Sequence, residues 1–344
     1  MKKNNYFITG GAGFIGSNFI RYLLNRNQNA RILNFDSLTY AGNLNNLSDI
    51  EKDPRYFFVK ADICEIKKIE NVFDQFHPDF VVNFAAESHV DRSILHPDIF
   101  VKSNVLGVQN LLQVSLQHGV KKYLQISTDE VYGSLGKTGT FKETTPLDPR
   151  SPYSASKASA DLLTQSYFHT FNLPINISRC SNNYGPYQFP EKLIPLTILN
   201  CLRGKKIPVY GEGLNVRDWI HVEDHCSAID LILHQGVEGE VYNVGANNER
   251  SNIEIVKLII RILADLQPGL KVSEDLISYV EDRKGHDLRY AIDSIKIQQK
   301  LHWKPLISFE NGLKDTVRWY LDHSDWLDSI ITKDYLAYYQ NVFW

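Results

Sequence analysis

Cysteine is scarce in this sequence: four occur among 344 residues, at positions 64, 180, 201 and 226. No two of them have the spacing of a Cys-x-x-Cys metal or redox pair, and their number and scatter argue against a disulfide framework. Isolated cysteines of this kind are typical small buried hydrophobes of proteins in a reducing compartment. We therefore expect a cytoplasmic protein.

A long uninterrupted apolar segment is also missing. The opening MKKNNYFITG passes from two lysines into a short strand, without the roughly 7–15 apolar residues of a signal peptide. The most apolar helix candidate, residues 253–266, is interrupted by four charged side chains, so it does not have the composition of a membrane-spanning segment. The formal net charge of −3 gives no positive field for nucleic acid or an anionic membrane. We expect neither as a partner.

Short apolar runs alternate with amphipathic patterns through the first half of the chain. The expected strands are 5–10, 30–36, 56–62, 79–86, 122–128 and 174–180, and the expected helices between them are 15–27, 64–76, 97–119 and 151–171. This alternation, with nearly continuous apolar strands, is typical of an α/β fold with a doubly wound parallel sheet, the Rossmann architecture.

After about residue 181 the sequence becomes rich in loops, Pro and Gly. We predict a Rossmann domain over residues 1–180, carrying the chemistry, and a smaller C-terminal α/β substrate-binding lobe over residues 181–344. The chain is expected to cross back to the sheet near 215–245. Such a lobe would lie beside the carboxyl ends of the strands, where doubly wound folds bind ligands.

A glycine-rich turn, ITGGAGFIGS, follows the first expected strand and opens the first expected helix. Glycines at positions 10, 13 and 16 allow a tight turn and close approach to a pyrophosphate, while the helix amino end offers unpaired N–H groups. Asp36 closes the second strand 20 residues after Gly16, where a carboxylate accepts bonds from a ribose and favours NAD over NADP. Asp62 and Ile63 end the third strand, where they can meet the adenine edge.

Tyr153 and Lys157 lie four residues apart in a helical pattern, SPYSASKASAD, and therefore face the same side. An ammonium beside a phenol, together with a positive nicotinamide, favours the phenolate and lowers the pKa of the tyrosine toward neutral pH. The phenolate can then take a proton from a hydroxyl while hydride leaves the same carbon. This spacing also occurs by chance on many helices, and the glycine loop upstream makes it informative.

The fifth expected strand ends in adjacent polar groups, Thr128, Asp129 and Glu130, within LQISTDEVYG. Two neighbouring carboxyls push their pKa values apart, so that one stays protonated while the other is ionised. Such a pair supplies an acid and a base at adjacent positions. The alternative is that Asp129 caps a turn and Glu130 is solvated.

The glycine loop, the strand-end hydroxyl and Tyr-x-x-x-Lys together resemble the extended short-chain dehydrogenase/reductase family. Within that family, the similarity to dTDP-glucose 4,6-dehydratases runs nearly end to end, over DSLTYAGN, AAESHVDRSI, STDEVYG, SPYSASKASAD, SNNYGPYQFPEKLIP, VRDWIHVEDHC and GHDLRYAID. STDEVYG is the most diagnostic segment, because related epimerases tend to carry small or hydroxyl residues where this chain has Asp129 and Glu130.

The resemblance implies conversion of dTDP-glucose to its 4-keto-6-deoxy product, with recycled, tightly bound NAD. Tyr153 would be the base for oxidation at C4, with Lys157 beside it and Thr128 holding the C4 oxygen. Glu130 would remove the C5 proton, and Asp129 would protonate the departing C6 hydroxyl. Hydride would then return to C6.

The resemblance also implies two sets of binding residues. Those for the cofactor are Gly10, Gly13, Phe14, Ile15, Gly16, Asp36, Ser37, Leu38, Thr39, Asp62, Ile63, Phe84, Ala85, Ala86, Ser88, Ser103, Tyr153, Lys157 and Asn183. Those for the nucleotide sugar are Ser88, Thr128, Asn182, Lys192, Leu193, Pro208, Val209, Tyr210, Arg217, Asn252, Asp282, Arg283 and His286. Arg217 suits a diphosphate, because its planar fork matches phosphate oxygens.

Other interpretations stay open at this point. A 4-epimerase would use the same Tyr153 and Lys157 but would need no elimination acids, and another nucleotide could replace thymidine. A catalytically silent binding protein is disfavoured, because every chemical position is filled. His221 and His225 invite a metal interpretation, but the HVEDH pattern lacks His-Glu-x-x-His spacing, so we expect structural histidines and no metal.

Two further expectations come from the resemblance. The helices at 97–119 and 151–171 resemble the pair that forms a homodimer in this family, although their apolar faces suit an intramolecular core equally well. The segment EDRKGHDLRYAID departs from the family at Lys284 and Leu288, where proline and arginine are usual. This departure affects the expected nucleotide contacts and leaves the expected chemistry unchanged.

Overall fold

The computed structural model of the protein describes residues 3–283, 285–331, 335 and 339, so Lys284 and most of the C-terminal residues after 331 lie outside it. Within the described residues, seven strands form one sheet in the order β10-β6-β5-β4-β1-β2-β3, and every neighbouring pair is parallel. They are β1 (Asn4–Thr9), β2 (Ala30–Asp36), β3 (Tyr56–Lys60), β4 (Phe80–Asn83), β5 (Lys122–Thr128), β6 (Ile175–Cys180) and β10 (Val241–Val244). The predicted doubly wound parallel sheet is confirmed.

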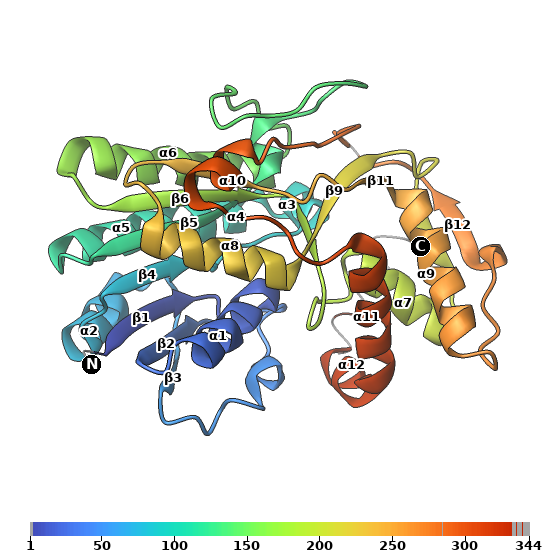
Figure 1. Ribbon diagram of the computed structural model, residues 1–344, viewed down its shortest axis with the longest axis horizontal. Helices are drawn as coiled ribbons and strands as arrows, with labels where there is room; N and C mark the ends of the chain where they lie inside the picture. The colour runs from blue at the N-terminus through green and yellow to red at the C-terminus, as the bar shows by residue number, and fades with distance from the viewer. Residues whose placement is uncertain (1–2, 284, 332–334, 336–338, 340–344) are drawn as a thin grey trace.

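Both faces of this sheet are covered by helices (Figure 1). Side chains alternate along β1, so that Tyr6 and Ile8 pack on one face and Phe7 on the other, all fully buried. The first face carries α1 (Phe14–Arg26), α8 (Val222–Gln235) and α10 (Ile295–Leu301), and the second carries α2 (Ile66–Phe76), α5 (Gly107–Gln117) and α6 (Pro152–Phe171). Burial on both faces explains why the strands are almost continuously apolar.

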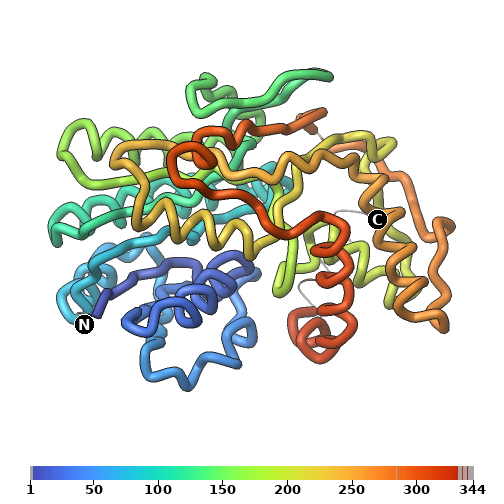
Figure 2. Tube along the Cα trace, in the orientation of Figure 1, coloured from blue at the N-terminus to red at the C-terminus, as the bar shows by residue number. Residues whose placement is uncertain are grey.

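The chain returns to the sheet after residue 180. In Figure 2 the yellow segment of α8 runs beside the blue segment of α1, and both contribute to one hydrophobic cluster. Strand β10 then pairs with β6, from Val241 opposite Ile177 to Val244 opposite Cys180. The division of the chain into two domains at residue 180, with a crossing near 215–245, stays a prediction.

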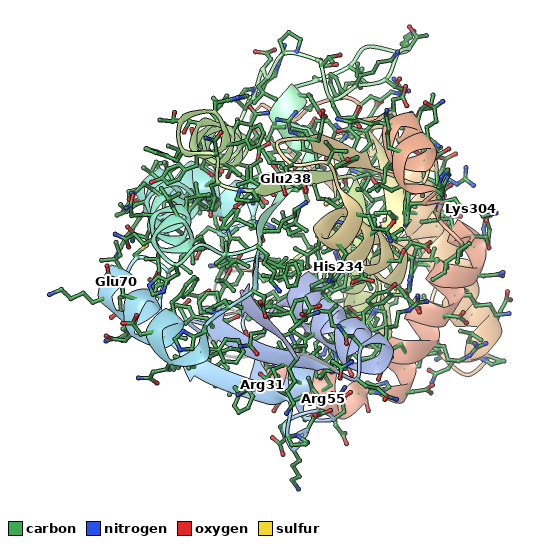
Figure 3. The ribbon with its side chains drawn as sticks, turned by 60° about the vertical axis from the view of Figure 1, so that its left-hand side comes forward. Arg31, Arg55, Glu70, His234, Glu238 and Lys304 are labelled. Atoms are coloured by element: carbon green, nitrogen blue, oxygen red, sulfur yellow. The ribbon has the colours of Figure 1, made fainter. Side chains whose placement is uncertain are left out.

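The other elements after residue 180 form a lobe beside the carboxyl ends of the strands (Figure 1). Strands β7 (Asn182–Tyr184), β9 (Val216–His221) and β11 (Glu249–Ser251) form one small sheet, and β8 (Ile207–Tyr210) pairs in parallel with β12 (Ile277–Val280). Helices α7 (Leu193–Leu202), α9 (Asn252–Leu266), α11 (Phe309–Asp322) and α12 (Ser324–Ile330) enclose a separate core. With the left-hand side of Figure 1 turned forward, Figure 3 shows Arg31, His234 and Glu238 near the amino ends of the strands, opposite this lobe.

The expected helix at 97–119 is one continuous helical stretch with a wider turn inside it. It consists of α4 (Pro97–Val101), a π-helical turn (Lys102–Leu106) and α5, which ends at Gln117. Asn104 in the π turn accepts from the backbone N–H of Glu87 at 2.8 Å and donates to its carbonyl at 2.9 Å. The widened turn thus holds the segment after β4 in place.

Local sequence explains where α6 begins. The Ser151 hydroxyl accepts from the Ser154 N–H, the Ser154 hydroxyl accepts from the Ser151 N–H, and Pro152 occupies the first turn. The start of the helix therefore fixes Tyr153 and Lys157, one turn apart, on its buried face.

Candidate active site

The glycine loop between β1 and α1 packs so closely on neighbouring backbone that side chains would not fit at two of its positions. Gly10 has a positive φ of 66°, and a Cβ there would come within 2.5 Å of the Ala85 nitrogen. A Cβ on Gly16 would come within 2.4 Å of the Gly10 carbonyl oxygen. Close backbone approach at the amino end of α1 is what a pyrophosphate requires, so the loop fits the predicted dinucleotide.

Asp36 at the end of β2 is fixed against this loop. Its two carboxylate oxygens accept from the Ala12 N–H at 2.9 Å and from the Leu38 N–H at 2.8 Å. Burial raises the pKa of Asp36, and the two backbone N–H bonds oppose that shift. The carboxylate is therefore held at the cavity wall in a defined orientation, which suits an acceptor for ribose hydroxyls.

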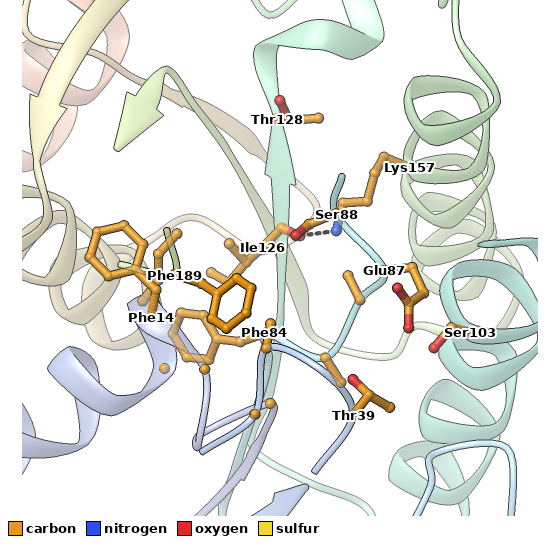
Figure 4. A pocket seen from close by; sticks show the side chains of 18 of the residues that line it. Phe14, Thr39, Phe84, Glu87, Ser88, Ser103, Ile126, Thr128, Lys157 and Phe189 are labelled. Atoms are coloured by element: carbon orange, nitrogen blue, oxygen red, sulfur yellow. Dashed lines mark hydrogen bonds between the residues drawn. The ribbon is translucent and has the colours of Figure 1, made fainter. Parts of the chain in front are cut away.

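Two adjoining cavities lie at the carboxyl ends of the strands. The first, about 290 Å³, runs from the glycine loop to the end of β5, and Figure 4 shows Phe14, Phe84 and Phe189 on one side of it and Thr39, Glu87 and Ser103 on another. The second, about 170 Å³, lies between the sheet and the lobe. Six residues line both: Glu130, Asn182, Asn183, Gln188, Glu191 and Lys192. A ligand in one cavity would therefore adjoin a ligand in the other.

The structure brings nearly all the predicted site residues to these walls. Every predicted cofactor residue except Leu38 lines the first cavity, and every predicted catalytic residue does so as well. Every predicted substrate residue except Asp282 lines one of the two cavities. Leu38 contributes its N–H to Asp36, and Asp282 accepts a bond from the His286 ring. The individual roles of these residues stay predictions.

Tyr153 and Lys157 face the first cavity from α6. Lys157 is buried and donates from Nζ to the Ile126 carbonyl at 2.6 Å. Burial lowers the pKa of Lys157, while the Asp161 carboxylate one turn along the helix opposes this shift. The ammonium is thus positioned by strand β5 and by its own helix.

The pKa of Tyr153 is raised, whereas the neighbouring Lys157 led us to expect a lowered value. Burial, followed by the Glu130 carboxylate, raises it well above its ordinary value, and a bond with the Thr128 hydroxyl lowers it in part. The sequence pattern could not show this, because burial and the facing acids depend on the folded arrangement. A positive charge placed in the cavity beside Tyr153 would favour the phenolate.

The carboxyl end of β5 delivers the two adjacent acids into the site. The Thr128 hydroxyl accepts from the Glu130 N–H at 3.2 Å and so begins a short 3₁₀ turn (Asp129–Tyr132). Gly133 ends the turn with a φ of 87°, where a Cβ would meet the Asp148 carbonyl at 2.5 Å. The STDEVYG segment is therefore a tight turn that places Asp129 and Glu130 side by side.

A buried network holds the far end of this turn. The Tyr132 hydroxyl donates to Asn243 at 2.7 Å and accepts from Arg179 at 3.0 Å. Arg179 is itself paired with Asp161 of α6 at 2.8 Å, and both are almost fully buried. The turn with the acids and the helix with Tyr153 therefore share one set of polar contacts.

The two acids have different surroundings. Asp129 is only 1% exposed, and among the described residues its Oδ2 has no hydrogen-bond partner. Burial, followed by the Glu130 carboxylate, raises the pKa of Asp129 well above its ordinary value. Burial also raises the pKa of Glu130, but three cations oppose that shift: Lys192, Arg217 and Arg283. Asp129 is therefore suited to hold a proton and Glu130 to take one.

Arg217 lines the second cavity from β9 and is oriented by backbone carbonyls. Its guanidinium donates to the carbonyls of Val216 at 2.8 Å and Asp287 at 2.9 Å, and it lies 4.3 Å from the centre of the Tyr290 ring. Burial lowers the pKa of Arg217. A buried cation held by neutral carbonyls still carries its full charge, which suits an anionic group such as a diphosphate.

Arg283 reaches the same cavity from the other side. It forms an ion pair with Asp91 at 2.6 Å, and it lies 4.9 Å from the centre of the Tyr210 ring. The Tyr210 hydroxyl also donates to Asp91, at 3.1 Å. This cluster joins the segment after β4 to β8 and to the loop after β12.

Sequence reasoning did not single out several residues that line these cavities. They include His89, Asp91, Ser181, Gln188, Phe189, Glu191, Trp219, Asp287 and Tyr290. Most of them lie within segments that carry the family resemblance, next to residues that were singled out. Their position next to those residues in the sequence could have identified them as candidates.

His221 and His225 have structural contacts. His221 caps α8 by accepting from the Glu223 N–H at 3.3 Å, and the His225 ring bonds the Asn183 side chain at 2.8 Å. Burial lowers the pKa of His225 to about 3, so its ring is neutral. Over residues 3–283, 285–331, 335 and 339, no group of three His, Cys, Asp or Glu side chains could hold a metal ion.

The chain resembles known proteins over most of its length. Residues 7–316 match the family model described as GDP-mannose 4,6 dehydratase. The chain is 50% identical over 342 residues to dTDP-glucose 4,6-dehydratase of Neisseria meningitidis serogroup B, covering 95% of this chain and 96% of the relative.

Two solved structures are also similar. The dTDP-glucose 4,6-dehydratase of Bacillus anthracis, in complex with NAD, is 50% identical with a TM-score of 0.87, covering 95% of this chain and all of that one. That of Streptomyces venezuelae, with NAD and TDP bound, is 45% identical with a TM-score of 0.89 and the same coverage. The chain therefore belongs to the dTDP-glucose 4,6-dehydratase family.

Proposed function

We propose that this protein converts dTDP-glucose to dTDP-4-keto-6-deoxyglucose and water, with NAD as its recycled cofactor. The observation that carries this proposal is the adjacent pair of buried Asp129 and half-buried Glu130 beside Tyr153, where the two cavities meet. A dehydrogenase that only oxidises a sugar hydroxyl needs the tyrosine. Loss of water additionally needs an acid and a base on neighbouring atoms.

The first cavity would hold the cofactor. The glycine loop would take the pyrophosphate and Asp36 the adenine-side ribose, while Tyr153 and Lys157 would border the nicotinamide. When bound, NAD accepts hydride from C4 and returns it to C6, and its positive ring favours the tyrosine phenolate. Tyr153 would take the proton of the C4 hydroxyl, and Thr128 would hold that oxygen.

The elimination would use the two acids in turn. Once C4 is a ketone, the C5 hydrogen is acidic, and the Glu130 carboxylate would take it as a proton. Asp129, whose raised pKa favours its protonated form, would give its proton to the departing C6 hydroxyl, which leaves as water. When hydride returns to C6, Glu130 would give its proton back to C5, which completes the 4-keto-6-deoxy product. Proton transfers thus take place at two neighbouring carbons, as the side-by-side placement of the acids allows.

The second cavity would hold the nucleotide. Arg217 and Arg283 supply positive charge for the diphosphate, and Pro208, Val209 and Tyr210 line the same cavity. The preference for thymidine follows the Streptomyces venezuelae relative, whose structure has NAD and TDP bound. Epimerisation is a second candidate, since it would use the same tyrosine, but nothing in it requires Asp129 and Glu130.

We further propose a homodimer in the cytoplasm. Exposed apolar side chains gather on α4 and its π turn (Ile99, Val101 and Leu106) and on α6 (Leu162), and a shallow hollow lies between these helices. A second copy of the chain would cover this surface.

All four cysteines are free thiols, which suits a reducing compartment such as the cytoplasm. Among the described helices, none has the length and hydropathy needed to cross a bilayer.

One labelling experiment tests the reaction. The protein as purified is given dTDP-glucose or UDP-glucose deuterated at C4, without added NAD. We expect a 4-keto-6-deoxy product with deuterium at C6, formed preferentially from the dTDP sugar. Recovery of a sugar with galactose stereochemistry would overturn the proposal in favour of an epimerase, and faster turnover of UDP-glucose would overturn the thymidine preference.

The dimer has its own test. Leu162→Asp places a charge on the proposed interface and should convert the protein to monomers in sedimentation velocity. Leu306→Asp, at another exposed leucine outside α4–α6, is the matched control and should leave the mass unchanged. A monomeric wild type, or a dimer that survives the Leu162 substitution, would contradict this assignment.

A further inference from the structure

Three segments that are distant in the sequence meet beside the cofactor cavity. They are the loop 37–43 after β2, the short helix α3 (Val90–Leu95) after β4, and the segment 185–192 before α7. Thr39, Ala41 and Gly42 of the first segment line the cavity, as do Gln188, Phe189 and Glu191 of the third. In Figure 4, Thr39 and Phe189 lie on different sides of it.

One side chain from each segment joins a single cluster. The Tyr40 hydroxyl donates to Glu191 Oε1 at 3.1 Å, and Arg92 Nε donates to Glu191 Oε2 at 3.3 Å. Arg92 also lies over the Tyr40 ring, 3.7 Å from its centre. Each of the three residues therefore contacts the other two. We call Tyr40, Arg92 and Glu191 the clasp.

The clasp is reinforced by its neighbours. The rings of Tyr40 and Phe189 meet edge to face at 5.8 Å. Lys192, next to Glu191, donates to the Ser88 carbonyl at 2.9 Å, which is a second tie between the third segment and the chain just before α3. The Glu191 side chain is only 4% exposed, so its bonds are shielded from water and are worth more than surface contacts.

We propose that the clasp retains NAD and NADH in the first cavity during turnover, by tying the loop after β2 to the segment before α7. This inference rests on the proposed function, in which hydride is taken up and returned within one catalytic cycle. A cofactor that left after the oxidation would strand a 4-keto sugar and consume NAD. Tyr40, Arg92 and Glu191 are thus positioning residues that act on the walls of the cavity.

Tyr40→Phe is the sharpest test, because it removes one hydroxyl and keeps the ring under Arg92. Loss of a bond to a buried carboxylate should speed the dissociation of NAD by about tenfold or more. Dissociation is measured on the purified holoenzyme by displacement with excess fluorescent NAD analogue. Tyr6→Phe is the matched control: its hydroxyl also bonds side chains, His234 and Asn27, and Tyr6 does not line either cavity. The control should keep the wild-type rate.

Arg92→Gln is a second and independent variant, which keeps the test informative if the Tyr40 variant does not fold. It should also release NAD faster. Because both residues act through Glu191, the double variant should release NAD more slowly than the product of the two single effects predicts.

Turnover gives a second readout. With dTDP-glucose present, NADH absorbance should enter the ultrafiltrate of the clasp variants and not that of the wild type, and added NAD should restore their rate. The proposal is overturned if Tyr40→Phe and Arg92→Gln both release NAD within twofold of the wild type, or if they change only the KM for dTDP-glucose. A wild type that makes no 4-keto-6-deoxy sugar would instead refute the proposed function, while the dissociation rates would still test the clasp.

Discussion

Two aspartates lie at the carboxyl ends of parallel strands in this protein, and both are buried. Asp36 at the end of β2 accepts two backbone N–H bonds, one on each oxygen. Asp129 at the end of β5 has a Thr128 hydroxyl at 3.3 Å from one oxygen, and no hydrogen-bond partner for the other within the described part of the chain. Asp129 also has a second carboxylate beside it, which further raises its pKa.

This difference in hydrogen bonding suits Asp36 to binding a ligand and Asp129 to transferring a proton. Two N–H bonds stabilise the ionised form of Asp36 and fix its orientation. Burial without such bonds favours the protonated form of Asp129 and leaves its proton available to a ligand. The same residue type at equivalent places in the fold can thus serve two purposes, and the surrounding donors decide which.

The largest expected effect comes from making the same substitution at both strand ends. Asp129→Asn should lower kcat for product formation by about 10²–10⁴-fold, because the amide cannot supply the proton that the C6 hydroxyl needs. Asp36→Asn should change kcat by less than about tenfold when NAD is saturating. Product is measured by the absorbance of the 4-keto sugar in alkali. Equal losses of kcat in both variants would contradict the distinction between Asp36 and Asp129.

The affinity for NAD should show the opposite pattern. Asp36→Asn should raise the Kd for NAD by about 10–100-fold, since an amide cannot accept both backbone bonds and hold the ribose. Asp129→Asn should leave this Kd within about threefold of the wild type, because Asp129 is not placed at the adenine end. Titration calorimetry on protein stripped of NAD measures both values. A larger effect at Asp129 than at Asp36 would refute the assigned roles.

The pH dependence of stability gives a smaller effect. The folded-state pKa of Asp129 is raised above its unfolded value of about 4, so its contribution to stability is complete below that pH and is lost as the pH rises through the folded pKa. Asp129→Asn removes this loss, and its Tm relative to the wild type should increase as the pH rises above about 4, the unfolded value. Asp36→Asn should be less stable than the wild type by about 1–3 kcal/mol. Thermal unfolding across this pH range tests both, and a Tm difference for Asp129→Asn that falls with pH would contradict the raised pKa.

Much of the fold and of the site could be predicted from local patterns in the sequence. The glycine loop, the Ser151–Pro152 helix start and the polar end of β5 each depend on residues close together in the chain. Their geometry could therefore be anticipated from spacing and backbone preferences. The parallel sheet likewise followed from alternating apolar strands and helices.

Contacts between distant segments were beyond such patterns. The bonds Tyr40–Glu191 and His225–Asn183 join residues 151 and 42 positions apart, respectively. The raised pKa of Tyr153 results from burial and from Glu130, which face it only in the folded chain. The π turn that holds Glu87 depends on the fit of one helix against the segment after β4. These features could be recognised only from the three-dimensional structure.

In the proposed reaction, the end of β5 adds elimination to a site that already transfers hydride, and this added step can be isolated. It is tested most directly in a single turnover of Glu130→Gln with dTDP-glucose, following bound NADH at 340 nm and product by rapid quench. We predict that NADH forms at a rate within about tenfold of the wild type and then persists, while the 4-keto-6-deoxy product is delayed by about 10²-fold or more. Loss of NADH formation in parallel with loss of product would contradict the account.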